Sequence, residues 1–224
     1  MSAAVLVLRP EPGASRTAER LAGLGLEPIR FPLFTLKRGV WAPPDPGGYD
    51  AILLTSANAV RLGGPGLAVF HQLPAYAVGA ATARAARDAG FRDVRQGGGD
   101  VAATVPLLAD AGHAHVLHPC GEDVRPYDAL GLRIDRLVVY RAVPLGDAAG
   151  LAAVLPQGEL WALVHSPRAG ERLAALVSPD ARIRIGVIAI SAAAADACGP
   201  GWRAMAVAGA PNENALLQCL QMLV

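Results

Sequence analysis

The chain has 224 residues, of which 53% are hydrophobic, 17% charged and 5% aromatic. This composition excludes a disordered chain and is typical of a globular protein with a substantial core. The formal net charge of +1 excludes the basic surface expected of a nucleic-acid-binding protein. Gly, Pro or Arg interrupts every apolar stretch before it reaches the length of a membrane span, so we expect no contact with a membrane.

Three cysteines, Cys120, Cys198 and Cys219, lie far apart and form no CxxC pair. Their spacing supports neither a disulfide framework nor a zinc site. The first eight residues read as a strand and lack the basic and long apolar regions of a signal peptide. We therefore predict a cytoplasmic protein without a metal.

Short apolar runs of strand length alternate with helical patterns along the chain. The predicted strands are residues 4–8, 29–36, 51–55, 75–78, 115–118, 134–143, 160–165, 183–189 and 203–207. The predicted helices include residues 16–24, 81–89, 101–111, 169–176 and 212–222. Strands followed by helices predict parallel sheets flanked by helices, and the continuous apolar strands fit sheets that are covered on both faces.

The chain also repeats itself once. Pro10 aligns with Pro119 at an offset of 109, while Ser56 with Ser166, Gly79 with Ala189 and Gly99 with Gly209 align at an offset of 110. Four segments in one order at one spacing indicate a duplicated α/β lobe, because the units of a solenoid are much shorter. Similarity among unrelated βα units is the alternative explanation. With two similar lobes we expect a ligand to bind between them.

Two predicted strands have no obvious helix after them, residues 30–36 and 136–143, and they occupy equivalent places in the two repeats. Each leads into a stretch rich in Pro and Gly. We expect these strands to connect the lobes, paired as a short two-stranded linker.

The sequence contains no GxSxG elbow, no GxxxxGK[ST] loop and no GxGxxG after a strand. Small hydroxyl residues recur instead at strand-to-helix turns: Ser56, Thr82, Ser166 and Ser191. Each could simply cap its helix, but a set of such turns could also present N–H groups to several carboxylates. His118 and His165 end predicted strands, where a half-buried structural role is the simpler interpretation.

Several segments together resemble the uroporphyrinogen-III synthase family. They are residues 5–10, 19–28, 31–33, 49–60, 77–83, 119–121, 139–140 and 165–167, and the likeness runs across nearly the whole chain. In this chain His165 stands where the family often has a threonine. The resemblance implies two α/β lobes, a discontinuous one of residues 1–35 plus 144–224 and an inserted one of residues 40–138. Linker strands at about 30–39 and 136–143 would join them.

The resemblance implies an enzyme without a cofactor, a lyase that closes the linear tetrapyrrole hydroxymethylbilane to uroporphyrinogen III. The reaction would lose water and invert ring D through a spiro intermediate. Tyr140 matches the family's linker tyrosine and is the candidate acid. The candidate substrate-binding residues are Arg9, Ser56, Asn58, Gly79, Thr82, Ser166 and Ser191.

Other functions remain open at this point. The main alternative is a non-catalytic or regulatory homologue whose two lobes bind an anionic small molecule. A sugar- or nucleotide-modifying enzyme would need a glycine-rich phosphate loop and a clustered base, and neither is found. We expect a monomer, because no exposed apolar stripe in the sequence requires a partner.

Overall fold

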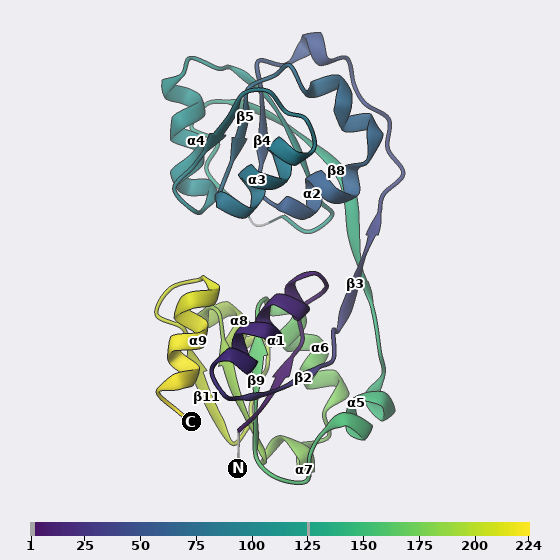
Figure 1. Ribbon diagram of the computed structural model, residues 1–224, viewed down its shortest axis with the longest axis vertical. Coiled ribbons are helices and arrows are strands. Elements are labelled where there is room, and N and C mark those ends of the chain that lie inside the picture. Colours follow the sequence, from purple (N-terminus) through teal and green to yellow (C-terminus); the bar gives the residue numbers. More distant parts are fainter. Residues whose placement is uncertain (1–2, 125) are drawn as a thin grey trace. The chain divides into compact units, whose positions relative to one another are not determined.

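The computed structural model describes residues 3–124 and 126–224 (Figure 1). Three residues lie outside the described ones: Met1 and Ser2 of the predicted lobe one and Arg125 of the predicted lobe two. The strands are β1 (Ala4–Val7), β2 (Glu27–Arg30), β3 (Phe34–Arg38), β4 (Ala51–Leu54), β5 (Ala75–Ala77), β6 (Val94–Gln96), β7 (His115–Gly121), β8 (Arg133–Pro144), β9 (Leu160–Val164), β10 (Ile185–Ala189) and β11 (Ala204–Val207).

The α-helices are α1 (Gly13–Gly23), α2 (Ala57–Gly63), α3 (Ala80–Asp88), α4 (Val101–Asp110), α5 (Ala148–Val154), α6 (Pro167–Leu176), α7 (Pro179–Arg182), α8 (Ala192–Asp196) and α9 (Glu213–Gln221). Two 3-10 helices, η1 (Pro46–Gly48) and η2 (Pro65–Phe70), lie in the first half of the chain. None of the helices described here combines the length and the apolar character needed to cross a membrane.

The chain divides into two compact units. Unit 1 consists of Met1–Thr35 and Val143–Val224, and unit 2 consists of Leu36–Ala142. Unit 1 contains a five-stranded sheet in the order β11-β10-β9-β1-β2, and unit 2 contains a six-stranded sheet in the order β3-β8-β7-β4-β5-β6.

The two sheets confirm the internal repeat. The sequence offsets pair β1 with β7, β9 with β4, β10 with β5 and β11 with β6. With β2 and β8 as the remaining equivalents, the five strands of unit 1 and five of the six strands of unit 2 follow the same order, and β3 is the extra strand at the edge of the unit 2 sheet. The pairs β1–β2, β1–β9, β9–β10 and β10–β11 in unit 1, and β4–β5, β4–β7, β5–β6 and β7–β8 in unit 2, are parallel. The predicted fold class, two similar α/β lobes of which one is discontinuous, is therefore confirmed.

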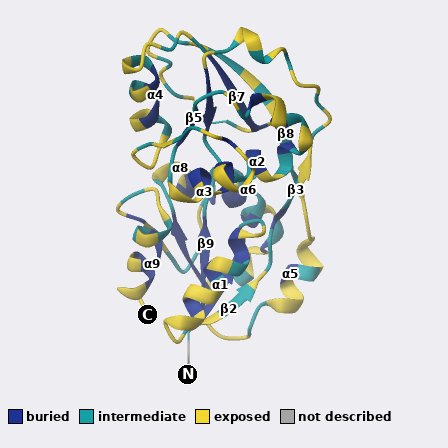
Figure 2. Cartoon of the chain, turned by 45° about the horizontal axis from the view of Figure 1, so that its top comes forward, coloured by how far each residue is buried: buried dark blue, intermediate teal, exposed yellow. Residues whose placement is uncertain are grey.

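Each sheet is covered on both faces, which explains its continuous apolar strands. In unit 1, buried residues of α1 and α9 pack on one face in a cluster with Val5, Val7, Trp161 and Leu163. In unit 2, α2 and α3 pack on one face and α4 on the other. Figure 2 shows central strands such as β9 and β7 buried and the outer sides of the helices exposed.

The predicted single strand 29–36 is wrong, because the structure divides this segment into β2 and β3. Up to Leu33 the backbone bonds to β1 and the residue after it, since the Phe31 and Leu33 N–H groups donate to the carbonyls of Val7 and Leu8. Pro32 has no N–H to continue a ladder. β3 then pairs with β8 instead. The segment changes partners at the proline, so it cannot be one strand.

β3 and β8 run antiparallel. The N–H of Gly39 donates to the carbonyl of Val139 at 2.8 Å, and the N–H of Leu145 donates to that of Leu33 at 2.9 Å. The pairing of the two predicted linker strands with each other is thereby confirmed.

Candidate active site

In each unit, the predicted site residues other than Tyr140 lie where the parallel strands end and the following helices begin. Ser56 and Asn58 follow β4, Gly79 and Thr82 follow β5, and Tyr140 lies on β8 (unit 2). In unit 1, Arg9, Ser166 and Ser191 follow β1, β9 and β10, which are neighbouring strands. Because carboxyl ends of parallel strands meet at one edge, each unit gathers its predicted residues on the edge where α/β sheets bind ligands.

In unit 2, Tyr140 reaches across β7 to the turn after β4. A β-bulge between Cys120 and Gly121 brings Tyr140 opposite Gly121. Its ring lies against that glycine so closely that an added Cβ there would be 2.7 Å from Tyr140 Cζ. The phenol forms a hydrogen bond with Ser56, whose Oγ also accepts one from the Asn58 N–H at 3.1 Å. Gly121 is therefore needed for the contact between Tyr140 and Ser56.

Burial raises the pKa of the Tyr140 phenol above its ordinary value. The hydrogen bond from Ser56 works in the opposite direction, and the neighbouring Cys120 thiol adds a smaller raising effect. The phenol is thus protonated at neutral pH. It can donate a proton, and Ser56 can stabilise the phenolate that would result.

The turn after β5 presents backbone donors. Gly79 is the N-cap of α3 and supplies no side-chain acceptor, and an added Cβ at this position would meet only open space. The N–H groups of Ala80 and Ala81 lie in the first turn of α3, and N–H groups in a first turn have no acceptor within their own helix. Thr82, in contrast, is only 6% exposed. Here the backbone is better placed for an anion than the threonine side chain.

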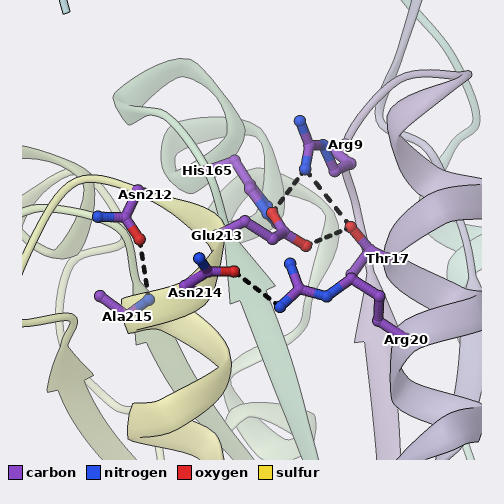
Figure 3. Close-up of polar contacts among 8 residues, drawn as sticks. All are labelled: Arg9, Thr17, Arg20, His165, Asn212, Glu213, Asn214 and Ala215. Carbon is purple, nitrogen blue, oxygen red and sulfur yellow. Dashed lines mark hydrogen bonds and ion pairs between the residues drawn. The ribbon is translucent and has the colours of Figure 1, made fainter. Parts of the chain in front are cut away.

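In unit 1, Arg9 belongs to a charged network that joins α1 to α9 (Figure 3). Nη1 of Arg9 donates to Oε2 of Glu213 at 2.6 Å, and Nε2 of His165 lies 2.9 Å from the same oxygen. The Thr17 hydroxyl donates to Oε1 at 2.5 Å. Gly13 leaves room for the Arg9 side chain, because a Cβ there would lie 2.5 Å from Arg9 Nε. Arg9 is therefore paired with a carboxylate of its own chain.

The partners of Glu213 control its charge. Burial alone would raise its pKa, but the hydrogen bonds from His165 and Thr17 and the charge of Arg9 lower the pKa to about 2. Burial also lowers the pKa of Arg9, although Glu213 opposes this effect. The Nδ1 atom of His165 is buried and has no hydrogen-bond partner among the described residues.

The predicted serines act as helix caps. Ser166 Oγ accepts from the Ala169 N–H at 3.3 Å at the start of α6, and Ser191 Oγ accepts from the Ala194 N–H at 3.4 Å at the start of α8. Each hydroxyl hydrogen can still be donated elsewhere. Capping and ligand binding are compatible at these positions.

Glu213 and Thr17 were not predicted from the sequence. An acidic residue after the Asn212 cap is typical of a helix N-terminus, and nothing local indicates a partner 204 residues away. His165 was interpreted as a half-buried structural residue, and its contact with Glu213 is compatible with that role. Within 3–124 and 126–224, no three His, Cys, Asp or Glu side chains are grouped so that they could hold a metal ion.

Two α/β units with polar side chains at the carboxyl edges of their sheets define a two-lobed α/β protein, and this edge is where such sheets bind ligands. The family described as uroporphyrinogen-III synthase HemD matches residues 15–218, and the chain belongs to this family. No curated protein sequence matches it significantly.

Among solved structures, the uroporphyrinogen-III synthetase of Helicobacter pylori is similar over 100% of both chains, with 20% identity and a TM-score of 0.68. A mutant uroporphyrinogen III synthase of Thermus thermophilus is similar over 100% of this chain and 97% of its own, with 19% identity and a TM-score of 0.52. At these identities the two structures support the fold.

Proposed function

We propose that the chain is a uroporphyrinogen-III synthase, a lyase that cyclises hydroxymethylbilane to uroporphyrinogen III with loss of water and inversion of ring D. The observation that carries this proposal is the family match over residues 15–218. The enzyme's main task is to hold a flexible chain so that the hindered bond forms first.

Tyr140 is the proposed acid. Its phenol is protonated at neutral pH and can give its proton to the departing hydroxyl, and the hydrogen bond from Ser56 stabilises the phenolate. Ring closure forms a carbon–carbon bond at a pyrrole carbon that then loses its hydrogen. The hydroxide leaves as water with the phenol proton, and the proton lost from the pyrrole carbon returns to the phenolate, so the net loss is one water. Tyr140 can therefore be reprotonated within the same turnover, and no cofactor takes part.

The remaining predicted residues are proposed to hold the substrate carboxylates. In unit 2 these contacts are the first-turn N–H groups after Gly79, with Ser56, Asn58 and Thr82 beside them. In unit 1 they are Arg9, Ser166 and Ser191. The pairing of Arg9 with Glu213 reduces its net attraction for an anion, and the remaining guanidinium N–H groups are the part proposed to bind substrate.

The test is a coupled assay. The protein receives hydroxymethylbilane generated in place, and the products are oxidised and separated into type I and type III uroporphyrin. We expect an excess of type III, and Tyr140→Phe should lower kcat by roughly 100-fold. Tyr49→Phe is the matched control, since this phenol contacts Asp135 at the opposite end of the unit 2 sheet, and its activity should be unchanged.

Type I product alone, formed at the rate of the blank, would reject the synthase and favour the binding or regulatory homologue. Equal activities of the wild type and Tyr140→Phe would reject the acid but not the enzyme. We also propose that the protein is a monomer in the cytoplasm. Light scattering in solution tests the first, and fractionation of the source cells tests the second.

A further inference from the structure

His118 is a buried, titratable residue that the proposed reaction does not use. It lies on β7 and is 0% exposed. Its Nε2 lies 2.9 Å from the Thr55 hydroxyl and its Nδ1 lies 2.8 Å from the Tyr127 hydroxyl. Burial, with a smaller effect of the Arg136 charge, lowers the pKa of His118 to about 4. The ring is neutral at pH 7, so one nitrogen donates to a hydroxyl and the other accepts from one.

The two hydroxyl contacts connect segments that both lead to Tyr140. Thr55 ends the β4 segment and precedes Ser56, which forms the hydrogen bond with the phenol. Tyr127 belongs to the segment that leads from β7 into β8, the strand that carries Tyr140. An apolar residue could fill the same interior space without the cost of burying polar atoms. The polar contacts of His118 thus fix the positions of two specific segments.

We propose that His118 is a positioning residue for Tyr140, acting through Thr55 to hold Ser56 against the phenol. This inference rests on the proposed role of Tyr140. Among the charged and titratable groups, Arg136 on β8 acts on His118, the Tyr127 phenol contacts its Nδ1, and Arg136 and Cys120 in turn act on Tyr127. The contact at Nε2 carries the effect on Tyr140, whereas the contact at Nδ1 mainly holds the Tyr127 segment.

Two substitutions separate these contacts. The glutamine amide of His118→Gln can take the place of Nε2 and keep the bond to Thr55, and the shorter amide of His118→Asn can take the place of Nδ1 and keep the bond to Tyr127. We expect His118→Gln to retain kcat within about threefold, and His118→Asn to lose roughly tenfold or more in kcat with KM little changed, since small misplacements of catalytic groups are costly.

Single hydroxyl deletions provide the same test if the His118 variants do not fold. Thr55→Val removes the Nε2 partner with little change of shape, and Tyr127→Phe removes the Nδ1 partner. We expect Thr55→Val to lower kcat as His118→Asn does, Thr55→Ser to restore it, and Tyr127→Phe to leave it near the wild-type value.

A titration separates this inference from the proposed function. The absorbance change on ionisation of Tyr140 is measured as the difference between each protein and its Tyr140→Phe counterpart. In Thr55→Val the phenol should ionise at a higher pH than in Thr55→Ser, because the Ser56 contact is lost, and this holds whether or not the protein forms type III product. Equal Tyr140 titrations in the two Thr55 variants, or losses of kcat that only follow thermal stability, would show that His118 merely fills the core.

Discussion

Replacing Glu213 with glutamine tests the charged network of unit 1. Glutamine has the same shape and can still accept from Arg9 and donate to Thr17, so the substitution removes mainly the charge. In the wild type, the Glu213 carboxylate accepts hydrogen bonds from Arg9 and Thr17 and contacts His165, and the Glu213 side chain is 21% exposed. For a charge-assisted network that is this buried, we expect a loss of about 2 kcal/mol in the free energy of unfolding at pH 7.

The pH dependence has a definite sign. The pKa of Glu213 is lowered from 4.5 to about 2 in the folded protein. The stabilisation is therefore complete above pH 4.5 and is lost as the pH falls toward 2. Linkage gives a loss of roughly 2 kcal/mol between pH 7 and pH 3, and solvent screening of the partly exposed side chain reduces it to about 1 kcal/mol. Between pH 7 and pH 3, the free energy of unfolding of the wild type should therefore fall by about 1 kcal/mol more than that of Glu213→Gln.

Urea unfolding at pH 7 and pH 3 provides the measurement. In a Trp41→Phe background both remaining tryptophans, Trp161 and Trp202, lie in unit 1, so their fluorescence reports on the unit that contains Glu213. Glu159→Gln is the matched control, since its carboxylate pairs with an arginine but is 70% exposed. Parallel losses of stability in the wild type and Glu213→Gln between pH 7 and pH 3, or equal effects of the two substitutions at pH 7, would refute the reasoning.

Two further outcomes follow from single contacts. Gly121→Ala places a Cβ 2.7 Å from Tyr140 Cζ, so the ring must move away from Ser56, and kcat in the coupled assay should fall by roughly tenfold or more. Arg172 donates to the carbonyls of Leu145 and Gly146, just after β8. Arg172→Gln should lower the stability of unit 1 by about 1 kcal/mol and accelerate hydrogen exchange of the Leu145 amide, and unchanged exchange there would contradict the assigned contact.

The sequence was sufficient to predict the fold because the evidence for it is local and repeated. Apolar runs of strand length, helical patterns between them and the offset of 109 to 110 residues each depend on short segments. The same is true of the caps, since Ser56, Ser166 and Ser191 bond to residues two or three positions ahead. The break between β2 and β3 was not predicted, because it depends on which strand each half pairs with, and Pro32 only permits the change.

The site contacts could be predicted only in part, because most of them join distant parts of the chain. The turns that carry Ser56 and Gly79 follow from strand-to-helix patterns. The bond between Arg9 and Glu213 joins the turn after the first strand to the last helix. Similarly, the position of Tyr140 against Gly121 depends on a bulge in β7 that no residue pattern indicates.

The internal repeat reproduces the fold of one unit in the other but not its chemistry. The offset of 109 places Arg9 opposite His118, and the offset of 110 places His165 opposite Thr55. In unit 2, His118 and Thr55 are in direct contact, with 2.9 Å between the imidazole and the hydroxyl. In unit 1, their equivalents Arg9 and His165 both contact Glu213 instead, at distances of 2.6 Å and 2.9 Å. A neutral pair whose imidazole is fully buried can fix a turn without attracting ions, whereas a partly exposed charged network responds to ligands and pH. Equivalent strand ends thus support the proposed proton donor in unit 2 and a charged network in unit 1.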